Sequence, residues 1–459
     1  MIQNKLVASV FAPLRLLALL RWRHLFFLLV IALSLRLVIP KADFDEHLSR
    51  EAAIRSGVAF DVARNTSMGR IGLVSSLQWA PLPTILNLFV APFSSVGWRG
   101  YSACIIGAFS LAVLTYATGE WFRNLGFHSL VAYAASCSYF LVPAFCIHAR
   151  TGTSALLFIL LSFLSITRLL SWLRSSRMQD LAICGICLGL AILTRYQSAI
   201  LLVTAICIVS WRIRASRTIE KYAEATFLVF LVPCLYGVGL WFFGNWLIMN
   251  NPLFFLRGLW PDASLGFGHG LLTLLREGCE WEMLLVPAGL ILPALLVQLI
   301  PDSGKRKALR VASVPAGVVL TIMLGISRPD LGGMPERTKD VAGIVQFLEK
   351  SFPGSTFVVS GYRGYEFLAA KRWDRSCNWV HTLQLDWNAV VEDYKGNDIF
   401  ILVPKPKGAD RWEDIQLSYP AIWRHVPGFT LYEYNWDEWL ILASIEAHEP
   451  LLNQQWTSR

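Results

Sequence analysis

A short segment near the N-terminus holds the residues best suited to chemistry. Asp43, Asp45, Glu46 and His47 follow Pro40 closely, after the first long apolar run. A carboxylate in this position can serve as a general base that takes a proton from an attacking hydroxyl. Asp43 and Asp45 together could also hold a divalent metal, which hard oxygen ligands prefer. The same residues also fit a solvated loop that begins a helix, with Asp45 as the N-cap, Glu46 in the first turn and His47 at the surface.

The elements around this segment are those of a membrane protein. Of 459 residues, 55% are hydrophobic and only 16% are charged, whereas soluble domains carry roughly 25% charged residues. A membrane helix needs about 20 mainly apolar residues. We therefore expect nine spans, at residues 24–40, 100–121, 128–147, 153–172, 181–194, 197–212, 223–247, 281–300 and 309–326.

The distribution of basic residues orients these spans. With the N-terminus in the cytoplasm, the cytoplasmic segments carry 15 Lys and Arg, and the opposite short loops carry few. This is the pattern of the positive-inside rule. A further apolar stretch at 80–96 is expected to be an interfacial helix, because a span there would move the basic loops 212–221 and 305–310 outside. The first external loop then covers about residues 41–99.

The C-terminal part has a different composition. Residues 328–459 hold 14 basic and 18 acidic residues, against 27 and 14 in residues 1–327. Apolar residues at helical spacing predict a helix at 338–352, and runs of aliphatic and aromatic residues predict strands at 356–360, 398–403, 429–434 and 439–444. We expect residues 1–327 to form the transmembrane domain and residues 328–459 to form a soluble α/β domain outside the cytoplasm.

Several short motifs follow one another in an order that is informative as a set. Their order and topology resemble the GT-C superfamily of membrane glycosyltransferases, which includes dolichyl-phosphate-mannose protein mannosyltransferases, aminoarabinose transferases acting on lipid A, and bacterial relatives. The chain departs from the family pattern in having Pro-Leu-Pro where relatives usually have adjacent prolines, and in lacking an acidic residue near Arg150. The motifs are Leu35-Arg36-Leu37, Asp45-Glu46, Ala80-Pro81-Leu82-Pro83, Phe122-Arg123, His148-Ala149-Arg150-Thr151, Gly189 to Tyr196, Asn245 to Ile248 and Asn251 to Leu256.

The resemblance implies a sugar donor linked to a polyprenyl phosphate and used at the outer face of the membrane. The phosphate is the leaving group, so its developing charge needs cationic or amide donors. Arg150, Arg195 and Arg257 lie outside the membrane at predicted helix ends and are the candidates for this role. Each also fits an arginine that extends from the membrane to the interface.

The resemblance also ranks the acidic residues. Asp45 takes the first position of the Asp-Glu pair, so it is the expected catalytic base, with Glu46 in support. Gln78 and Trp79 precede the proline element and are expected to line the substrate site with His47. Tryptophan is also common at membrane interfaces, which is the alternative for Trp79.

We therefore expect an α-helical polytopic membrane protein with about nine transmembrane helices, GT-C-like, carrying a C-terminal α/β domain. Its expected activity is transfer of a hexosyl or pentosyl group from a polyprenyl-phosphate donor to a glycan, lipid or protein acceptor outside the cytoplasm. The expected location is a bacterial inner membrane, with no nucleic-acid partner. No cofactor is required by the sequence, and a divalent metal at Asp43 and Asp45 is left open. The alternatives are a non-catalytic assembly subunit and a transporter or flippase for an envelope lipid.

Overall fold

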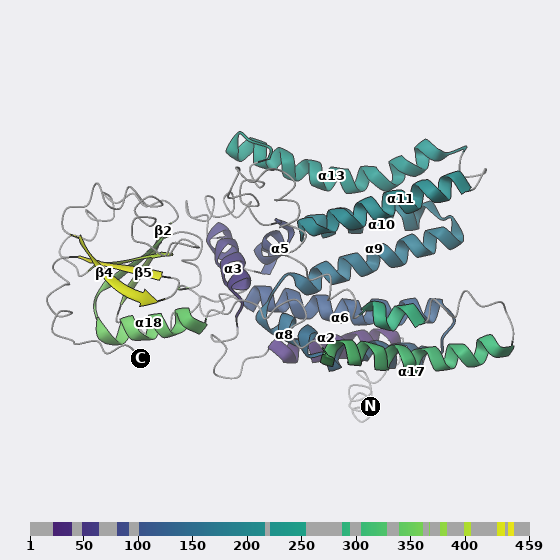
Figure 1. Ribbon diagram of the computed structural model, residues 1–459, viewed down its shortest axis with the longest axis horizontal. Coiled ribbons are helices and arrows are strands. Elements are labelled where there is room, and N and C mark those ends of the chain that lie inside the picture. Colours follow the sequence, from purple (N-terminus) through teal and green to yellow (C-terminus); the bar gives the residue numbers. More distant parts are fainter. Residues whose placement is uncertain are drawn as a thin grey trace, which may run out of the picture. The chain divides into compact units, whose positions relative to one another are not determined.

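The computed structural model describes residues 22–38, 48–63, 80–90, 101–215, 221–253, 287–293, 304–327, 339–360, 367, 377–382, 399–404, 429–436 and 439–444. They fall into two compact units (Figure 1). The first unit holds described residues 22–38, 80–83, 103–215, 221–253, 287–293 and 304–327. The second unit holds described residues 48–63, 84–90, 101–102 and those from 339 onward.

The first unit consists of apolar helices. Four helical stretches are long and apolar enough to cross a membrane, or five if one bent pair is counted as a span, within the described residues. The chain is therefore a polytopic membrane protein, and the count of nine spans stays a prediction. The helices are α2 (Trp22–Val38), α6 (Tyr101–Asn124), α7 (Ser129–Ser136), η5 (Cys137–Leu141), α8 (Pro143–Thr151), α9 (Ala155–Ser175), α10 (Met178–Ile192), η6 (Tyr196–Ser198), α11 (Ala199–Ala215), α13 (Ala223–Met249) and α17 (Gly304–Ser327).

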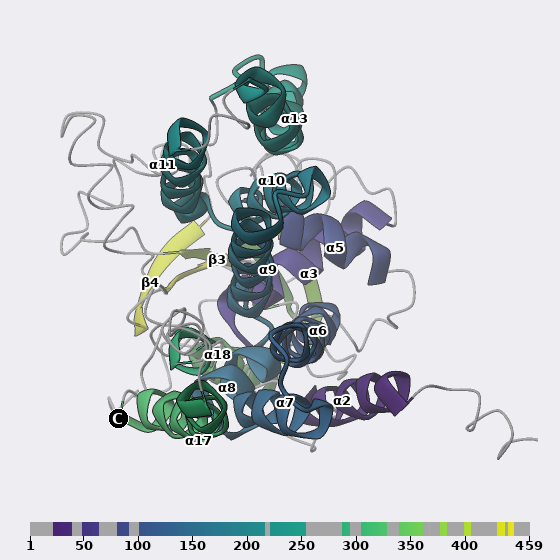
Figure 2. The same cartoon turned by 90° about the vertical axis from the view of Figure 1, so that its right-hand side faces the viewer.

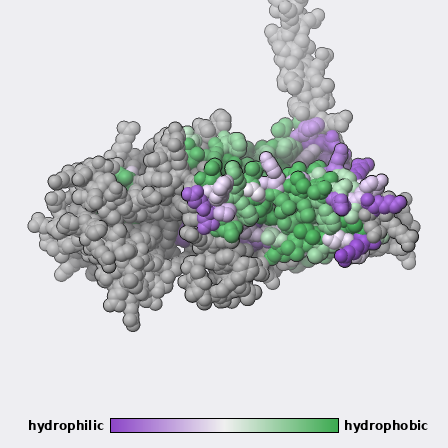
Figure 3. Space-filling view, turned by 90° about the horizontal axis from the view of Figure 1, so that it is seen from above, coloured by the Kyte–Doolittle hydropathy of each residue, from purple (hydrophilic) through white to green (hydrophobic). Residues whose placement is uncertain are grey.

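Burial separates central helices from peripheral ones. The apolar windows of α6 and α9 are each 67% buried, whereas those of α11 and α13 are 22% and 11% buried. Seen along the helices, α9 lies between α10 and α6 (Figure 2). The described surface seen in Figure 3 is apolar in its middle and hydrophilic toward its ends. Exposed side chains such as Val203, Leu235 and Leu247 therefore suit contact with lipid.

The span predicted at 128–147 is present as a bent helix pair and not as one continuous helix. The chain forms α7 and η5, and then α8 leaves at an angle of 69°. The cause is Pro143, which has no N–H for a helix to use and begins α8 at its first position. Val142, just before the proline, is extended, with φ −88° and ψ 109°. The motif His148-Ala149-Arg150-Thr151 forms the end of α8, and Gly152 caps it.

The bent pair nevertheless crosses the unit from end to end. At one end, the Tyr133 hydroxyl donates to Glu120 near the end of α6. At the other end, the Cys104 thiol near the start of α6 donates to Arg150 O at 3.2 Å. Residues 104 and 120 lie about 24 Å apart along a helix, at 1.5 Å per residue. The pair is therefore a broken span and not a loop that returns to its starting side.

This crossing defines two ends of the first unit. At the turn end, α8 stops, α9 begins, and the segment Thr194–Tyr196 joins α10 to η6. At the basic end, α6, α9 and α11 stop, and the arginines of their last turns gather. These arginines are Arg123, Arg174, Arg212 and Arg214.

Glycines set the distance between α10 and α13. A Cβ on Gly185 would lie 2.1 Å from the carbonyl oxygen of Phe230, and one on Gly189 would lie 3.0 Å from the Cα of Cys234. The two glycines are one turn apart on α10, which is the small-xxx-small spacing of closely packed membrane helices. Glycine at position 189 therefore allows α10 and α13 to pack closely.

The second unit contains a five-stranded mixed sheet in the order β2-β1-β3-β5-β4. The pairs β1–β2 and β1–β3 are parallel, and the pairs β3–β5 and β4–β5 are antiparallel. The predicted helix and four predicted strands are confirmed, and β2 was not predicted. The elements are α18 (Lys339–Ser351), β1 (Thr356–Ser360), β2 (Asn378–Thr382), β3 (Ile399–Pro404), β4 (Phe429–Trp436) and β5 (Trp439–Ser444).

The core between α18 and the sheet combines helical spacing of apolar residues in α18 with alternation of apolar residues in the strands. Val341, Ile344 and Leu348 of α18 pack with Phe357 of β1 and Phe400 of β3 in one buried cluster. The helix residues recur every three or four positions and form one face. A sheet face collects alternate residues of each strand, as expected for this packing.

Two further helices are described between α2 and α6, namely α3 (Arg50–Ala63) and α5 (Leu82–Val90). The nine residues of α5 extend for only about 13 Å, against the roughly 30 Å of a hydrocarbon core. Residues 91–96 lie outside the described part of the chain, so the expectation that residues 80–96 form an interfacial helix stays a prediction.

Candidate functional site

The turn between α10 and α11 is the centre of the candidate site. Arg195 N donates to Ala191 O at 2.8 Å, and the Thr194 hydroxyl donates to Leu190 O at 2.8 Å. These bonds use carbonyls at the end of α10 that have no helical partner. Arg195 itself is extended, with φ −152° and ψ 124°, and its side chain is half-buried. The turn therefore holds a guanidinium at the turn end of the first unit.

The proline element docks on this turn. Pro81 and Pro83 have no backbone N–H, so Leu82 supplies the one main-chain donor of the three residues. Leu82 N donates to Leu193 O at 2.8 Å, one residue before Thr194. The residue between the two prolines thus provides the donor that this contact needs.

Helix α13 contacts the turn through a tryptophan side chain. Trp241 Nε1 donates to the Tyr196 hydroxyl at 3.2 Å. One helical turn further on, Asn245 Nδ2 donates to Trp241 O at 2.8 Å, and the Asn245 side chain is fully buried. Sequence reasoning placed neither Trp241 nor Asn245 in the site. The available signal was their spacing, since both continue the face of α13 that carries Cys234.

Arg150 also lies at the turn end. Gly152, with φ 74°, caps α8 and donates its N–H to His148 O at 3.1 Å. His148 is buried and its Nδ1 lies 2.7 Å from the Thr153 hydroxyl, so it is part of the support of this cap. The Arg150 side chain is exposed. Arg150 and Arg195 are therefore at the same end of the unit, one exposed and one half-buried.

The remaining predicted site residues lie outside the described part of the chain. They are Asp43, Asp45, Glu46, His47, Gln78, Trp79 and Arg257. Their roles as base, supporting acid, substrate contacts and phosphate ligand stay predictions. Among the residues that the structure describes, no three His, Cys, Asp or Glu side chains gather as a metal site. The Asp43 and Asp45 pair is outside that set, so the metal alternative stays open.

One alternative for Asp45 can be corrected. The helix that follows the acidic segment is α3, which begins at Arg50. Its cap is Ser49, whose hydroxyl accepts from Ala52 N at 3.1 Å and whose carbonyl accepts from Ala53 N at 3.0 Å. The interpretation of Asp45 as the N-cap of this helix is therefore wrong.

Within the second unit, α3 and α5 are joined by a buried arginine. Arg55 is 5% exposed. Its Nε donates to Glu51 at 2.9 Å and its Nη1 donates to the Thr84 hydroxyl at 3.1 Å. Asn87, on the next turn of α5, accepts from the Ser102 hydroxyl at 2.6 Å. A buried charge that is paired and hydrogen-bonded in this way fixes the two helices to each other.

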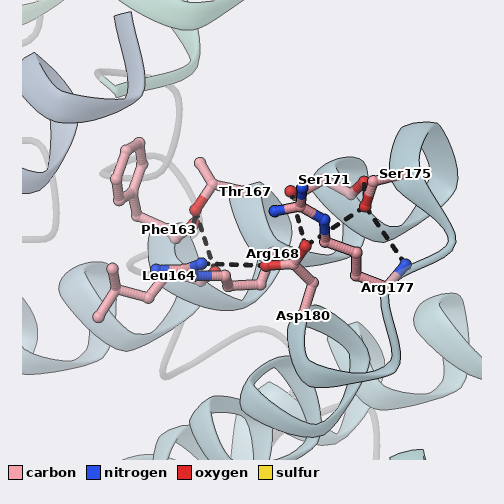
Figure 4. Close-up of polar contacts among 8 residues, drawn as sticks. All are labelled: Phe163, Leu164, Thr167, Arg168, Ser171, Ser175, Arg177 and Asp180. Atoms are coloured by element: carbon pink, nitrogen blue, oxygen red, sulfur yellow. Dashed lines mark hydrogen bonds and ion pairs between the residues drawn. The ribbon is translucent and has the colours of Figure 1, made fainter. Parts of the chain in front are cut away.

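A different polar cluster lies at the basic end (Figure 4). Asp180, in the first turn of α10, accepts from Arg168 at 3.0 Å and from the Ser171 hydroxyl at 3.0 Å. The Ser175 hydroxyl approaches the same carboxylate at 3.5 Å. A carboxylate near a helix N-terminus is also favoured by the helix dipole. The cluster closes the hairpin of α9 and α10, and its acceptors are already occupied.

No protein-family model and no curated protein matches the chain. Among solved structures, it is similar to ArnT from Cupriavidus metallidurans in the apo state, with 11% identity and a TM-score of 0.43, covering 92% of this chain and 98% of that one. It is also similar to the same protein bound to undecaprenyl phosphate, with 11% identity and a TM-score of 0.40, covering 91% and 97%.

Proposed function

We propose that the chain is a membrane glycosyltransferase that moves a hexosyl or pentosyl group from a polyprenyl-phosphate donor to an acceptor. The acceptor is a glycan, lipid or protein outside the cytoplasm. In this proposal the turn end faces outward, the basic end faces the cytoplasm, and the membrane is a bacterial inner membrane. The concentration of arginines at the basic end supports this orientation.

The observation that carries the proposal is the hydrogen bond from Leu82 to Leu193. It joins the proline element to the Gly189–Tyr196 motif, two segments that are distant in sequence and that the family resemblance pairs in one site. The joined segments lie beside the half-buried Arg195 at one end of an apolar helix unit. This is where a lipid phosphate held at the membrane surface would meet a fixed positive charge.

The chemistry assigned to the chain's residues is as follows. Asp45 takes the proton of the acceptor hydroxyl as the new glycosidic bond forms, and Glu46 supports it. Arg195, with Arg150 and Arg257, stabilises the charge that develops on the departing phosphate. Asp43 is the competitor for the base and, with Asp45, the candidate metal pair.

The distribution of ionisable residues does not favour a transporter. A transport pathway commonly carries ionisable side chains in the middle of its spans. Residues 103–119, 155–167, 181–194, 199–211 and 225–249, which make up the central parts of five described helical segments, contain no Asp, Glu, Lys or Arg.

The phosphate site is tested by binding of undecaprenyl phosphate to the purified full chain in nanodiscs. Arg195→Ala should weaken binding by about 10- to 150-fold, since a hydrogen bond to a charged group contributes roughly 1.5–3 kcal/mol. Arg195→Lys should recover part of this, because lysine keeps the charge but not the two-pronged geometry. Arg214→Ala is the matched control, since it removes the same charge at the basic end. Equal affinity for wild type, Arg195→Ala and Arg214→Ala would refute the phosphate site.

The base is tested separately by sugar transfer from lipid-linked donors. Asp45→Asn keeps the size of the side chain and removes its basicity, so transfer should fall by at least about 100-fold while undecaprenyl phosphate binding is kept. Loss of transfer only in Asp43→Asn would move the base to Asp43. Wild-type chain that binds the lipid but transfers no sugar would instead indicate the non-catalytic assembly subunit.

A further inference from the structure

The buried amide of Asn245 has an unused acceptor. Asn245 is 0% exposed, and its Oδ1 has no hydrogen-bond partner in the part of the chain that the structure describes. The orientation of the amide is fixed, because Nδ2 donates to Trp241 O at 2.8 Å and a flipped amide would set two oxygens against each other. A buried acceptor left unpaired costs roughly 1–3 kcal/mol relative to a paired one. Such a group calls for an explanation, and a missing ligand is one.

The position of Asn245 follows from a continuous contact face on α13. Phe230 and Cys234 lie against Gly185 and Gly189 of α10. About two turns after Cys234, Trp241 bonds Tyr196, which follows Arg195 in the turn. Asn245 is the next residue on this face, about 6 Å further along the helix. It therefore extends beyond the end of α10, on the side of α13 that faces the Arg195 turn.

A second buried polar atom belongs to the same turn. Ser198, three residues after Arg195, is 0% exposed, and its hydroxyl has no partner among the described residues. An amide oxygen accepts only, whereas a serine hydroxyl can donate or accept. Groups of this type, beside the Trp241 indole, suit a ligand that carries several hydroxyls and an apolar ring face.

We propose that Asn245 is a sugar-binding residue whose Oδ1 accepts a hydrogen bond from a hydroxyl of the donor's sugar, next to the phosphate held by Arg195. This inference rests on the proposed function and names the part of the donor that α13 recognises. Two residues then contact different parts of one ligand: Arg195 binds the phosphate and Asn245 binds the sugar.

The experiment compares undecaprenyl phosphate with undecaprenyl phosphates that carry glucose, galactose, mannose or arabinose, all in nanodiscs with the full chain. Wild type should bind at least one sugar-bearing lipid more tightly than undecaprenyl phosphate. Asn245→Leu, which keeps the branching at Cγ but is apolar, should lose about 3- to 10-fold in affinity for that lipid. Its affinity for undecaprenyl phosphate should not change.

The free protein gives a second readout that a purely structural asparagine would not give. Asn245→Leu should keep or raise the melting temperature of the empty protein, because it removes a buried unpaired acceptor. Asn87→Leu is the matched control and should lower the melting temperature, since Asn87 is buried and bonded to Ser102 at 2.6 Å. Asn245→Ser replaces the leucine variant in the binding comparison if the latter does not fold.

The outcomes are distinguishable. An unchanged preference for the sugar-bearing lipid in Asn245→Leu or Asn245→Ser overturns the inference and leaves the phosphate site intact. Equal binding of all lipids by wild type also overturns it. No binding of undecaprenyl phosphate by wild type removes the proposed function itself.

Discussion

Replacing Gly185 by alanine tests whether the contact between α10 and α13 depends on the absence of a side chain. The added Cβ would lie 2.1 Å from the carbonyl oxygen of Phe230. That oxygen belongs to the backbone of α13, so no side-chain rotation can move it away. The helices must separate locally or the backbone must distort. Gly239, in α13, is the matched control, because a Cβ there would meet nothing within 4 Å.

The magnitude follows from comparing the two variants. Both gain the helix propensity of alanine over glycine, about 1 kcal/mol, so this gain cancels in the difference. Gly185→Ala alone carries the cost of overpacking, typically about 1–3 kcal/mol. The clash is with backbone, so we expect the upper part of this range. Gly239→Ala should therefore be more stable than Gly185→Ala by roughly 2–3 kcal/mol.

The measurement is SDS-induced unfolding of the purified full chain in mixed micelles, with wild type and both variants in parallel. Gly185→Ala should also weaken binding of undecaprenyl phosphate, because α10 carries the Arg195 turn and α13 contacts that turn through Trp241. Equal free energies of unfolding for the two variants would show that α10 and α13 are not in close contact. The same result would remove the argument that places Asn245 beside the turn.

Three further outcomes are expected. Glu51→Gln should lower the free energy of unfolding by about 3 kcal/mol, because Arg55, which is 5% exposed, keeps its charge without that carboxylate. In thermal unfolding, a Glu51→Gln, Arg55→Met double variant should recover part of this loss. If it recovers none, the ion-pair argument is contradicted. Asp180→Asn should lower the free energy of unfolding by less, about 1 kcal/mol in the same assay, because its partner Arg168 is 46% exposed. A loss as large as that of Glu51→Gln would show that exposure does not weaken this ion pair. A cysteine at residue 459 should react with an impermeant maleimide in intact spheroplasts, and reaction only after lysis would reverse the proposed orientation.

The helices and most strands could be predicted because their signals are local. Hydrophobic length located the apolar helices, and runs of aliphatic and aromatic residues located β1 and β5 at their observed bounds. The bend at Pro143 was missed because the apolar run continues through it, although a proline inside such a run is itself a warning. β2 was missed because only Trp379 and Val380 of its five residues are apolar, so it does not form an apolar run.

The candidate site was less predictable because its contacts join distant segments. The sequence shows that Leu82 is the only donor within Pro-Leu-Pro, but not that its acceptor is Leu193. Arg195 was found because a charged residue between two apolar runs stands out locally. Trp241 was not found, and Asn245 was noted only as part of a family-like motif, because within an apolar helix their role depends on which face meets α10, and that face is fixed by Gly185 across the helix pair.

Two carboxylates at the basic end are paired, whereas the turn end carries a buried amide oxygen without a partner among the described residues. At the basic end, Glu120 is paired with Arg123 and bonded by Tyr133, and Asp180 is paired with Arg168. A ligand binding there would have to break these interactions, and the gain from new contacts would be offset by the loss of old ones. At the turn end, Asn245 holds a buried acceptor without a partner in the described chain. A ligand hydroxyl that reaches it displaces no protein partner, so the hydrogen bond contributes to binding in full. The physical case for a ligand site is therefore stronger at the turn end, which is also where the proline element and the two described arginines of the predicted site lie.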